Sequence, residues 1–175
     1  MRDAMLFRTR SYVLLAAALI ASALGATVAI AQKPHTPRPG TAERTRILDA
    51  IRGNPRNSVR FIVHDLFVIK GKDATFAYAV VEPSKQEYDG GQYILEARGS
   101  GQDWRVIWSV RGGGSSDCDA AAEYYRSVAR YLKVRGVRVG DLNPTHEEEL
   151  QNLTAGEDGC WTIGDLGPEL PEAGD

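Results

Sequence analysis

The stretch DWRVIWSVR, residues 103–111, alternates bulky apolar residues with mostly polar ones. Residues 75–81, TFAYAVV, alternate between larger and smaller side chains. Successive side chains of a strand point to opposite faces, so a period of two predicts β-strands. Residues 59–63, 66–69 and 92–98 are further strand candidates, and glycine-containing turns separate most of these segments. Short consecutive strands with tight turns indicate a four- to five-stranded antiparallel meander.

Two helices are predicted, one before and one after the strands. Residues 42–52, AERTRILDAIR, place apolar residues on one face and follow Thr41, a good helix cap. Residues 119–134 follow Asp117, a second cap, and Gly136 can end that helix. We therefore expect an α+β fold with an N-terminal helix, the antiparallel meander, and a second helix packed on the sheet.

Residues 1–31 are typical of a secretory signal peptide. Basic residues precede an uncharged apolar run at residues 12–31, which ends in the small-x-small sequence AIA. We expect cleavage after Ala31, with a cut near Gly25 as the alternative, and export to the periplasm or out of the cell. The run is long enough to span a bilayer, so an uncleaved membrane anchor is the other interpretation.

The rest of the chain divides by composition into three parts. Residues 32–40, QKPHTPRPG, form a proline-rich spacer, residues 41–163 a single α+β domain, and residues 164–175 an acidic flexible tail. Residues 141–175 hold ten Asp and Glu and no Lys or Arg, whereas basic residues are in excess in residues 41–140. The acidic end either docks on a cationic partner or folds back on the basic body.

Cys118 and Cys160 are the only two cysteines of the chain. An even pair in an exported protein predicts a disulfide, because the compartments outside the cytoplasm are oxidising. The alternative is that Cys118 is a reactive thiol, since the start of a helix lowers the pKa of a thiol.

Residues 46–52, the strand at 59–63 and the sequence WRV at 104–106 resemble a layout that recurs in small exported bacterial proteins of unknown function. In that layout a short helix precedes a pair of strands, and a later strand carries Trp-x-Val. The resemblance covers residues 44–111, although Ala77 stands where an aromatic residue is expected. It implies a helix-plus-antiparallel-sheet arrangement of the cystatin or NTF2-like kind, an exported accessory protein and no catalytic residue.

His64 and Asp65 are the candidates for catalysis. An imidazole beside a carboxylate can act as a general base, with Glu96 as a second choice of carboxylate. Neighbours in a strand point to opposite faces, so His64 and Asp65 would meet only if the chain turns there. No Gly-x-Ser-x-Gly nucleophile motif accompanies them.

The sequence predicts no metal and no cofactor. The segment HEEEL at residues 146–150 has Leu150 where the zinc motif His-Glu-x-x-His needs its second histidine. Thr145 and Glu148 instead fit a capping box, which predicts a short helix. The chain has three histidines in total, too few with a paired cysteine set for a four-coordinate zinc site.

A basic patch is predicted on the second helix and just beyond it. Such a patch suits a polyanionic component of the cell envelope, or an envelope protein. Nucleic acid is not expected as a partner, because the exported chain is acidic overall. The patch consists of Arg126, Arg130, Lys133, Arg135 and Arg138.

Together these features predict an exported, non-catalytic accessory or binding protein of the bacterial periplasm or cell envelope. The alternative is a small-ligand-binding domain, or a hydrolase or isomerase with a cone-shaped pocket that uses His64. The apolar pocket of the small-ligand-binding domain would be lined by Phe61, Phe76, Tyr78 and Trp108, unless these four residues simply fill the core.

Overall fold

The computed structural model describes residues 33–53, 59–85, 90–99, 103–112, 117–155 and 163–171. All of them belong to Gln32–Asp175, the larger of two units into which the chain divides; the other is Met1–Ala31. The predicted signal peptide therefore lies outside the described residues, and export and cleavage stay predictions. Within the described part, no helix is long and apolar enough to cross a membrane.

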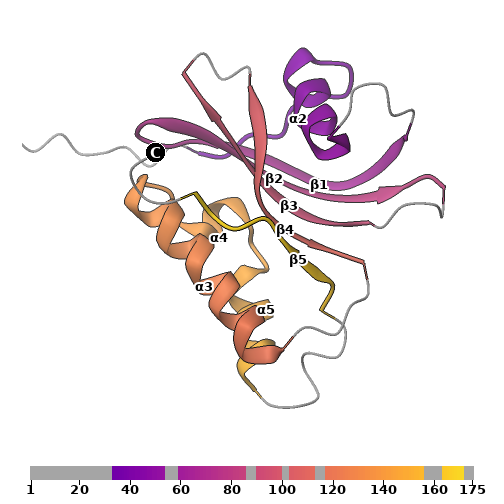
Figure 1. Ribbon diagram of the computed structural model, residues 1–175. Helices are drawn as coiled ribbons and strands as arrows, with labels where there is room; N and C mark the ends of the chain where they lie inside the picture. Colours follow the sequence, from indigo (N-terminus) through magenta and orange to yellow (C-terminus); the bar gives the residue numbers. More distant parts are fainter. Residues whose placement is uncertain are drawn as a thin grey trace, which may run out of the picture. The chain divides into compact units, whose positions relative to one another are not determined.

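A five-stranded antiparallel sheet forms the centre of the larger unit (Figure 1). The strands pair in sequence order, each with the next. This confirms the predicted α+β class and the antiparallel meander. The strands are β1 (Phe61–Lys70), β2 (Ala74–Pro83), β3 (Gly91–Arg98), β4 (Trp104–Arg111) and β5 (Asp165–Gly167).

The helices begin and end at residues suited to those positions. The Thr41 side chain accepts a hydrogen bond from the backbone N–H of Arg44, and Asp117 accepts from two N–H groups of the next helix. Gly136 ends that helix with a φ of +78°, which favours glycine. The helices are α2 (Ala42–Arg52), α3 (Cys118–Val134), α4 (Val139–Leu142) and α5 (His146–Thr154).

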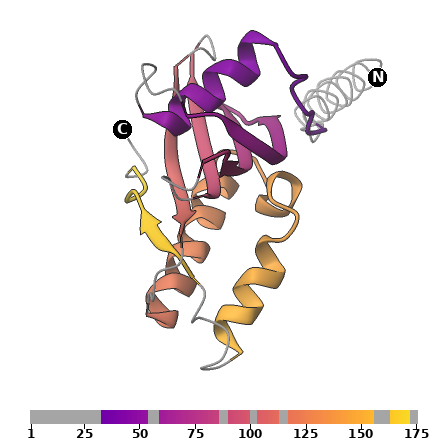
Figure 2. The same ribbon diagram turned by 90° about the vertical axis from the view of Figure 1, so that its right-hand side faces the viewer.

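The sheet has an apolar core on each face. On β2, Phe76 and Tyr78 belong to one core, whereas Ala77 and Ala79 belong to the other. Ile47 of α2 is buried on the alanine side, and α3, α4 and α5 cover the aromatic side, with α3 and α5 side by side (Figures 1 and 2). Burial of both faces explains why β2 has no polar row of side chains.

Two bulges interrupt the pairing. On β1, Val63 pairs with Val81 and Asp65 with Val80, which leaves His64 as an extra residue. The break in alternation at His64 is therefore a bulge inside one strand, and the two predicted apolar stretches form a single strand. On β4 the register shifts in the same way at Ile107, so that consecutive residues of β4 are buried in the same core.

The predicted spacer at residues 32–40 is corrected by the contacts of its described part. The backbone N–H and C=O of His35 both bond to Val68 of β1, at 2.9 and 2.8 Å. Pro37 is buried, and its carbonyl accepts from the Arg44 side chain at 3.2 Å. This segment is thus attached to the folded domain, because His35 pairs with Val68 at the outer edge of β1.

The predicted flexible tail at residues 164–175 is also corrected. Asp165–Gly167 forms β5, the strand that pairs with the outer side of β4. The hydroxyl of Tyr124 on α3 donates to the carbonyl of Pro168 at 3.1 Å. The acidic C-terminal part therefore begins with a strand that is held by both the sheet and a helix.

Candidate functional site

Glu96 of β3 is a completely buried carboxylate. It lies directly opposite Arg105 of β4 in the sheet, and its Oε2 accepts from Arg105 Nη2 at 2.6 Å and Nε at 3.1 Å. Arg98 Nε donates to the same oxygen at 3.2 Å, and the Tyr131 hydroxyl of α3 donates to Oε1 at 2.9 Å. Arg135 Nε lies 3.5 Å from Oε1. We call Glu96, Tyr131 and the three arginines the arginine cluster.

The electrostatics of the arginine cluster keep Glu96 ionised. Burial by itself raises the pKa of the Glu96 carboxyl, because the charged form loses water. The hydrogen bonds from Arg105 and Tyr131 and the charge of Arg98 outweigh that effect, so the net pKa lies below its ordinary value. One negative charge is therefore surrounded by three guanidinium groups, and the cluster is positive overall.

Arg135 was predicted to belong to an exposed basic patch, and that is wrong. Its side chain is only 8% exposed, with the guanidinium 3.7 Å from the centre of the Tyr131 ring. Its carbonyl accepts from the N–H of Lys72 in the β1–β2 turn at 2.9 Å, which ties the end of α3 to the end of the sheet. Because the cationic side chain stacks on an aromatic face, it is buried in the domain instead of facing solvent.

The other members of the predicted patch do not form one continuous surface charge. Arg126 and Arg130 both pair with Glu123 one or two turns earlier on α3, at 3.8 and 2.5 Å. Arg138 pairs with Asp141 of α4 at 2.7 Å. Lys133 is exposed. Two local acids thus pair with three of these arginines and offset part of their charge, as is common on helix surfaces.

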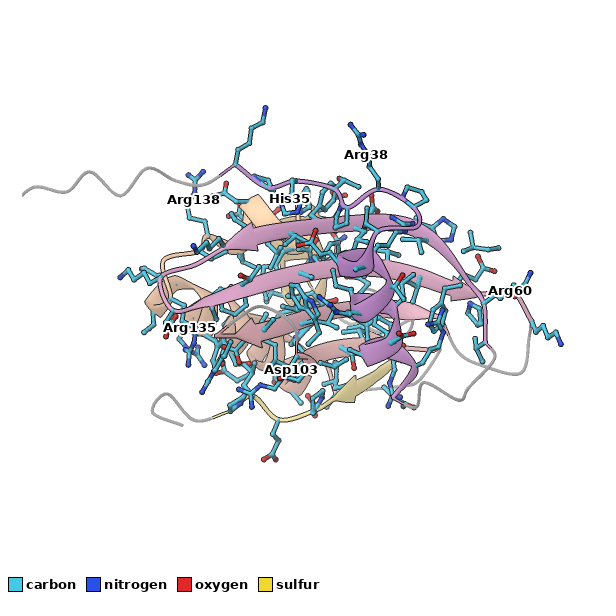
Figure 3. All side chains as sticks on the ribbon, turned by 90° about the horizontal axis from the view of Figure 1, so that it is seen from above. His35, Arg38, Arg60, Asp103, Arg135 and Arg138 are labelled. Atoms are coloured by element: carbon cyan, nitrogen blue, oxygen red, sulfur yellow. The ribbon has the colours of Figure 1, made fainter. Side chains whose placement is uncertain are left out.

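The excess positive charge lies instead at one end of the sheet, which we call the cationic end. In an antiparallel meander β1 and β3 finish, and β2 and β4 begin, at the same end of the sheet. The chain turns back near this edge at the end of α3, where Figure 3 shows Arg135 and Arg138. Basic residues outnumber acidic ones there. The basic members are Lys70, Lys72, Arg98, Arg105, Lys133, Arg135 and Arg138; the acidic ones are Asp73, Glu96, Asp103 and Asp141.

Arg98 and Arg105 are the members of the arginine cluster that reach solvent, with side chains 41% and 50% exposed. Both are held in place by the buried Glu96 carboxylate. A guanidinium fixed in this way presents a planar set of N–H donors to a carboxylate or phosphate with little loss of side-chain freedom. The arrangement is therefore suited to binding an anionic group.

His64 and Asp65 do not form a catalytic pair in this structure. His64 sits at the β1 bulge, and its Nε2 is 3.3 Å from Glu82 Oε2 of β2 instead of Asp65. Both partners are more than half exposed. Glu96, the second predicted carboxylate, is enclosed by arginines. The carboxylate beside His64 is therefore Glu82, at an exposed position on the sheet.

The four aromatic residues predicted as a pocket lining lie on opposite faces of the sheet. Phe61 packs on the α2 side, where the Arg52 guanidinium lies 5.3 Å from its ring centre. Phe76, Tyr78 and Trp108 are buried on the α3 side. They cannot line one pocket with Phe61, because the sheet separates them.

His146 is buried, although the sequence placed it only in a failed zinc motif. It is the first residue of α5, and its ring lies 5.2 Å from that of Tyr125. The predicted capping box is wrong, because the Thr145 hydroxyl lies within hydrogen-bond distance of Asn143 Oδ1 and Glu149 Oε1 instead of capping the helix. No cluster of His, Cys, Asp and Glu suited to a metal occurs among the described residues.

Cys118 is the first residue of α3 and is half-buried. Cys160 lies outside the described residues, so the bridge between them stays a prediction. Comparison with protein families, with curated proteins and with solved structures found no match for this chain.

Proposed function

We propose that this chain is an exported, non-catalytic binding protein of the bacterial periplasm or cell envelope, and that it binds an anionic component of the envelope. The observation that carries the proposal is the arginine cluster. There a single buried carboxylate fixes Arg98 and Arg105 at the surface of the cationic end.

The charge balance of the cluster favours an anion over other partners. Glu96 supplies one negative charge against three guanidinium groups, so an incoming anion meets a net attraction. Because Glu96 already restrains Arg98 and Arg105, binding costs less conformational entropy than it would for two unrestrained surface arginines. A phosphate or carboxylate group on a lipid or glycan matches this donor set.

The export half of the proposal rests on the sequence of residues 1–31 and on the resemblance to small exported proteins. That resemblance also supports the finer layout, in which an N-terminal helix precedes the meander and a second helix packs on the sheet. The ring contact between Tyr125 of α3 and Trp108 of β4 is consistent with it.

Binding to a soluble polyanion tests the proposal directly. We expect saturable binding of polyphosphate by the purified protein at low salt, and weaker binding as salt is raised. Arg105→Gln should weaken this binding roughly tenfold, because a charge-assisted hydrogen bond is lost. Arg105→Lys should give an intermediate affinity, since the charge remains but the planar donor set does not. Isothermal titration calorimetry measures all three.

Arg130→Gln is the matched control, because Arg130 pairs with Glu123 on α3 outside the arginine cluster. Its affinity should equal that of the unmodified protein. The proposal fails if polyphosphate and vesicles of phosphatidylglycerol both show no saturable binding at low salt. It also fails if Arg130→Gln weakens binding as much as Arg105→Gln while thermal unfolding shows both variants folded.

A further inference from the structure

Val134, the last residue of α3, is the most exposed large apolar side chain among the described residues, at 65%, followed by Ile62 of β1 at 51%. Single exposed apolar residues are common on soluble proteins and by themselves indicate nothing. The position of Val134 is what distinguishes it, because its neighbours in the sequence, Lys133 and Arg135, both belong to the cationic end. An apolar side chain is therefore exposed where positive charge is in excess.

The β1–β2 turn lies directly against the residues that follow Val134. The Lys72 N–H donates to the Arg135 carbonyl at 2.9 Å, and a Cβ on Gly136 would lie 3.0 Å from the side chain of Lys72. A Cβ on Gly71 would lie 2.8 Å from the same carbonyl. These close contacts fix the end of α3 and the basic turn beside each other.

The exposed charges of the cationic end are mostly positive. Its acids are the two exposed side chains Asp73 and Asp103, the buried Glu96, and Asp141, which is already paired with Arg138. The exposed basic side chains outnumber these acids, so an approaching anionic surface meets a net attraction. They are Lys70, Lys72, Arg98, Arg105, Lys133 and Arg138.

Ile62 lies at the other end of the sheet. Figure 3 shows Arg60, the residue before β1 begins, at the end opposite Arg135 and Arg138. Ile62 is paired in the sheet with Glu82 of β2, a carboxylate. The second exposed apolar residue therefore has an acid directly opposite it and serves as a natural comparison.

The chain also enters the domain at the cationic end. The bridge between His35 and Val68 is antiparallel, so the chain traced back from His35 runs alongside the last residues of β1, towards Lys70. Lys33, the first described residue, is exposed, and the apolar run at residues 12–31 ends just before it. A membrane segment formed by that run would therefore join the domain at its cationic end.

We propose that the cationic end docks on a bilayer of anionic phospholipid, with its basic side chains at the headgroup phosphates and Val134 at the boundary between headgroups and acyl chains. Each basic residue near an anionic membrane raises the binding constant about fivefold, and an inserted apolar side chain adds to this. A soluble polyanion would satisfy the charges and leave Val134 in water. The inference rests on the proposed function and narrows its anionic component to a lipid surface.

Paramagnetic broadening of methyl resonances identifies the surface that faces lipid. The full chain as purified after expression is labelled with ¹³C in its methyl groups and mixed with nanodiscs of phosphatidylglycerol and phosphatidylcholine in equal amounts. We expect a phosphatidylcholine that is spin-labelled near the head of its acyl chain to broaden the Val134 resonances. The Ile62 resonances should keep their linewidth. In nanodiscs of phosphatidylcholine alone the Val134 broadening should be roughly fivefold weaker, because the headgroups carry no net charge.

Val134→Ser and Ile62→Ser form a matched pair, because each replaces an exposed apolar side chain by a small polar one. Val134→Ser should lower the broadening of the Gly136 amide roughly threefold at the same lipid concentration, since the apolar contribution is lost. Ile62→Ser should leave it unchanged. Both variants should bind polyphosphate as the unmodified protein does, because neither removes a charge. Thermal unfolding checks that both fold, and the broadening in the unmodified protein depends on neither.

Three results would overturn the docking proposal and leave the proposed function standing, provided that polyphosphate still binds. One is broadening that is equal at Val134 and Ile62, or absent from both. Another is equal broadening of Val134 in nanodiscs of phosphatidylcholine alone. The third is unchanged broadening in a folded Val134→Ser variant, which would point to a glycan or a protein as the partner of the basic residues. Absence of both lipid and polyphosphate binding would overturn the proposed function as well.

Discussion

Glu96 and His146 are both buried ionisable residues, yet burial leaves one charged and the other neutral. Three guanidinium groups and a tyrosine hydroxyl surround Glu96, so its carboxylate is stabilised where it lies. His146 has the Tyr125 ring beside it and no anionic oxygen within hydrogen-bond distance among the described residues. Its pKa therefore falls to about 4 because burial dominates, and the backbone of Tyr125 opposes this only in part.

Neutral His146 makes the stability of the fold depend on pH. The unfolded chain takes up the proton near pH 6.5 and the folded chain only near pH 4. The contribution of His146 to stability is therefore complete above pH 6.5 and is lost progressively as the pH falls towards 4. Between pH 7 and pH 5 the free energy of unfolding should fall by about 2 kcal/mol from this residue. Urea denaturation at the two pH values measures it.

His146→Gln should abolish most of this pH-dependent loss, whatever it does to stability at pH 7. His64→Gln is the matched comparison, because His64 is an exposed histidine of β1 instead of a buried one of α5. Parallel stability curves for His146→Gln and the unmodified protein would contradict the prediction. Glu96 does not confuse the result, since its pKa lies below its ordinary value of 4.5 and the carboxylate stays ionised in this range.

At the scale of elements, local patterns predicted β2, β4, α2 and α3. Alternation of side chains and helix caps depend only on residues that are close together in the sequence. The bulge at His64 shifted the alternation of β1, so the sequence indicated two segments where there is one strand. β5 was missed because Asp165–Gly167 has no alternating pattern, and pairing with β4 and contact with α3 create it. A strand that forms only through pairing with residues distant in sequence need not show a strand pattern in its own residues.

The candidate site was predicted only in part, for a related reason. Arg135 was selected for its place in a basic run, but its burial on Tyr131 depends on how α3 meets the sheet. The pairing of Glu96 with Arg105 follows from the register of β3 and β4. Register is set by the whole sheet, so two charged residues nine positions apart gave no recognisable motif.

Tyr124 links α3 to β4 and to Pro168, the residue that follows the edge strand β5. Its hydroxyl accepts from the N–H of Ser109 at 3.1 Å and donates to the carbonyl of Pro168 at 3.1 Å, and its ring stacks on Trp108. Tyr124→Phe keeps the ring and removes both hydrogen bonds. We expect a loss of about 1–2 kcal/mol in the free energy of unfolding.

Amide hydrogen exchange identifies which strands are destabilised in Tyr124→Phe. Amides of β5 should exchange faster in Tyr124→Phe, because β5 has only three residues and pairs with one strand. Amides of β1 and β2 serve as the internal reference and should keep their protection. Uniformly faster exchange across all strands would show that Tyr124 stabilises the fold as a whole instead of β5.

At the scale of the whole molecule, different parts of the chain cover the two faces of the sheet. Residues before β1 cover the edge of β1 through His35 and one face through α2. Residues after β4 cover the other face through three helices and then return to add β5. β4 and β5 are neighbours in the sheet although α3, α4 and α5 lie between them in the sequence. A covalent link across this long connection would therefore lower the conformational entropy of the unfolded chain more than a link across a short loop.

The predicted disulfide between Cys118 and Cys160 would close that return path. Cys118 begins α3, and Cys160 precedes β5 by a few residues, so the bridge would enclose α3, α4 and α5 in one loop. Closing a loop of this length restricts the unfolded chain, and reduction should lower the free energy of unfolding by about 4 kcal/mol. Urea denaturation with and without a thiol reductant measures the loss, and a Cys118→Ser, Cys160→Ser double variant should not respond to the reductant.

Intact mass after alkylation of the native protein should show no modified cysteine without reduction and two with it. Two alkylated cysteines in the unreduced protein would contradict the bridge, and with it a covalent link between the start of α3 and the segment that precedes β5.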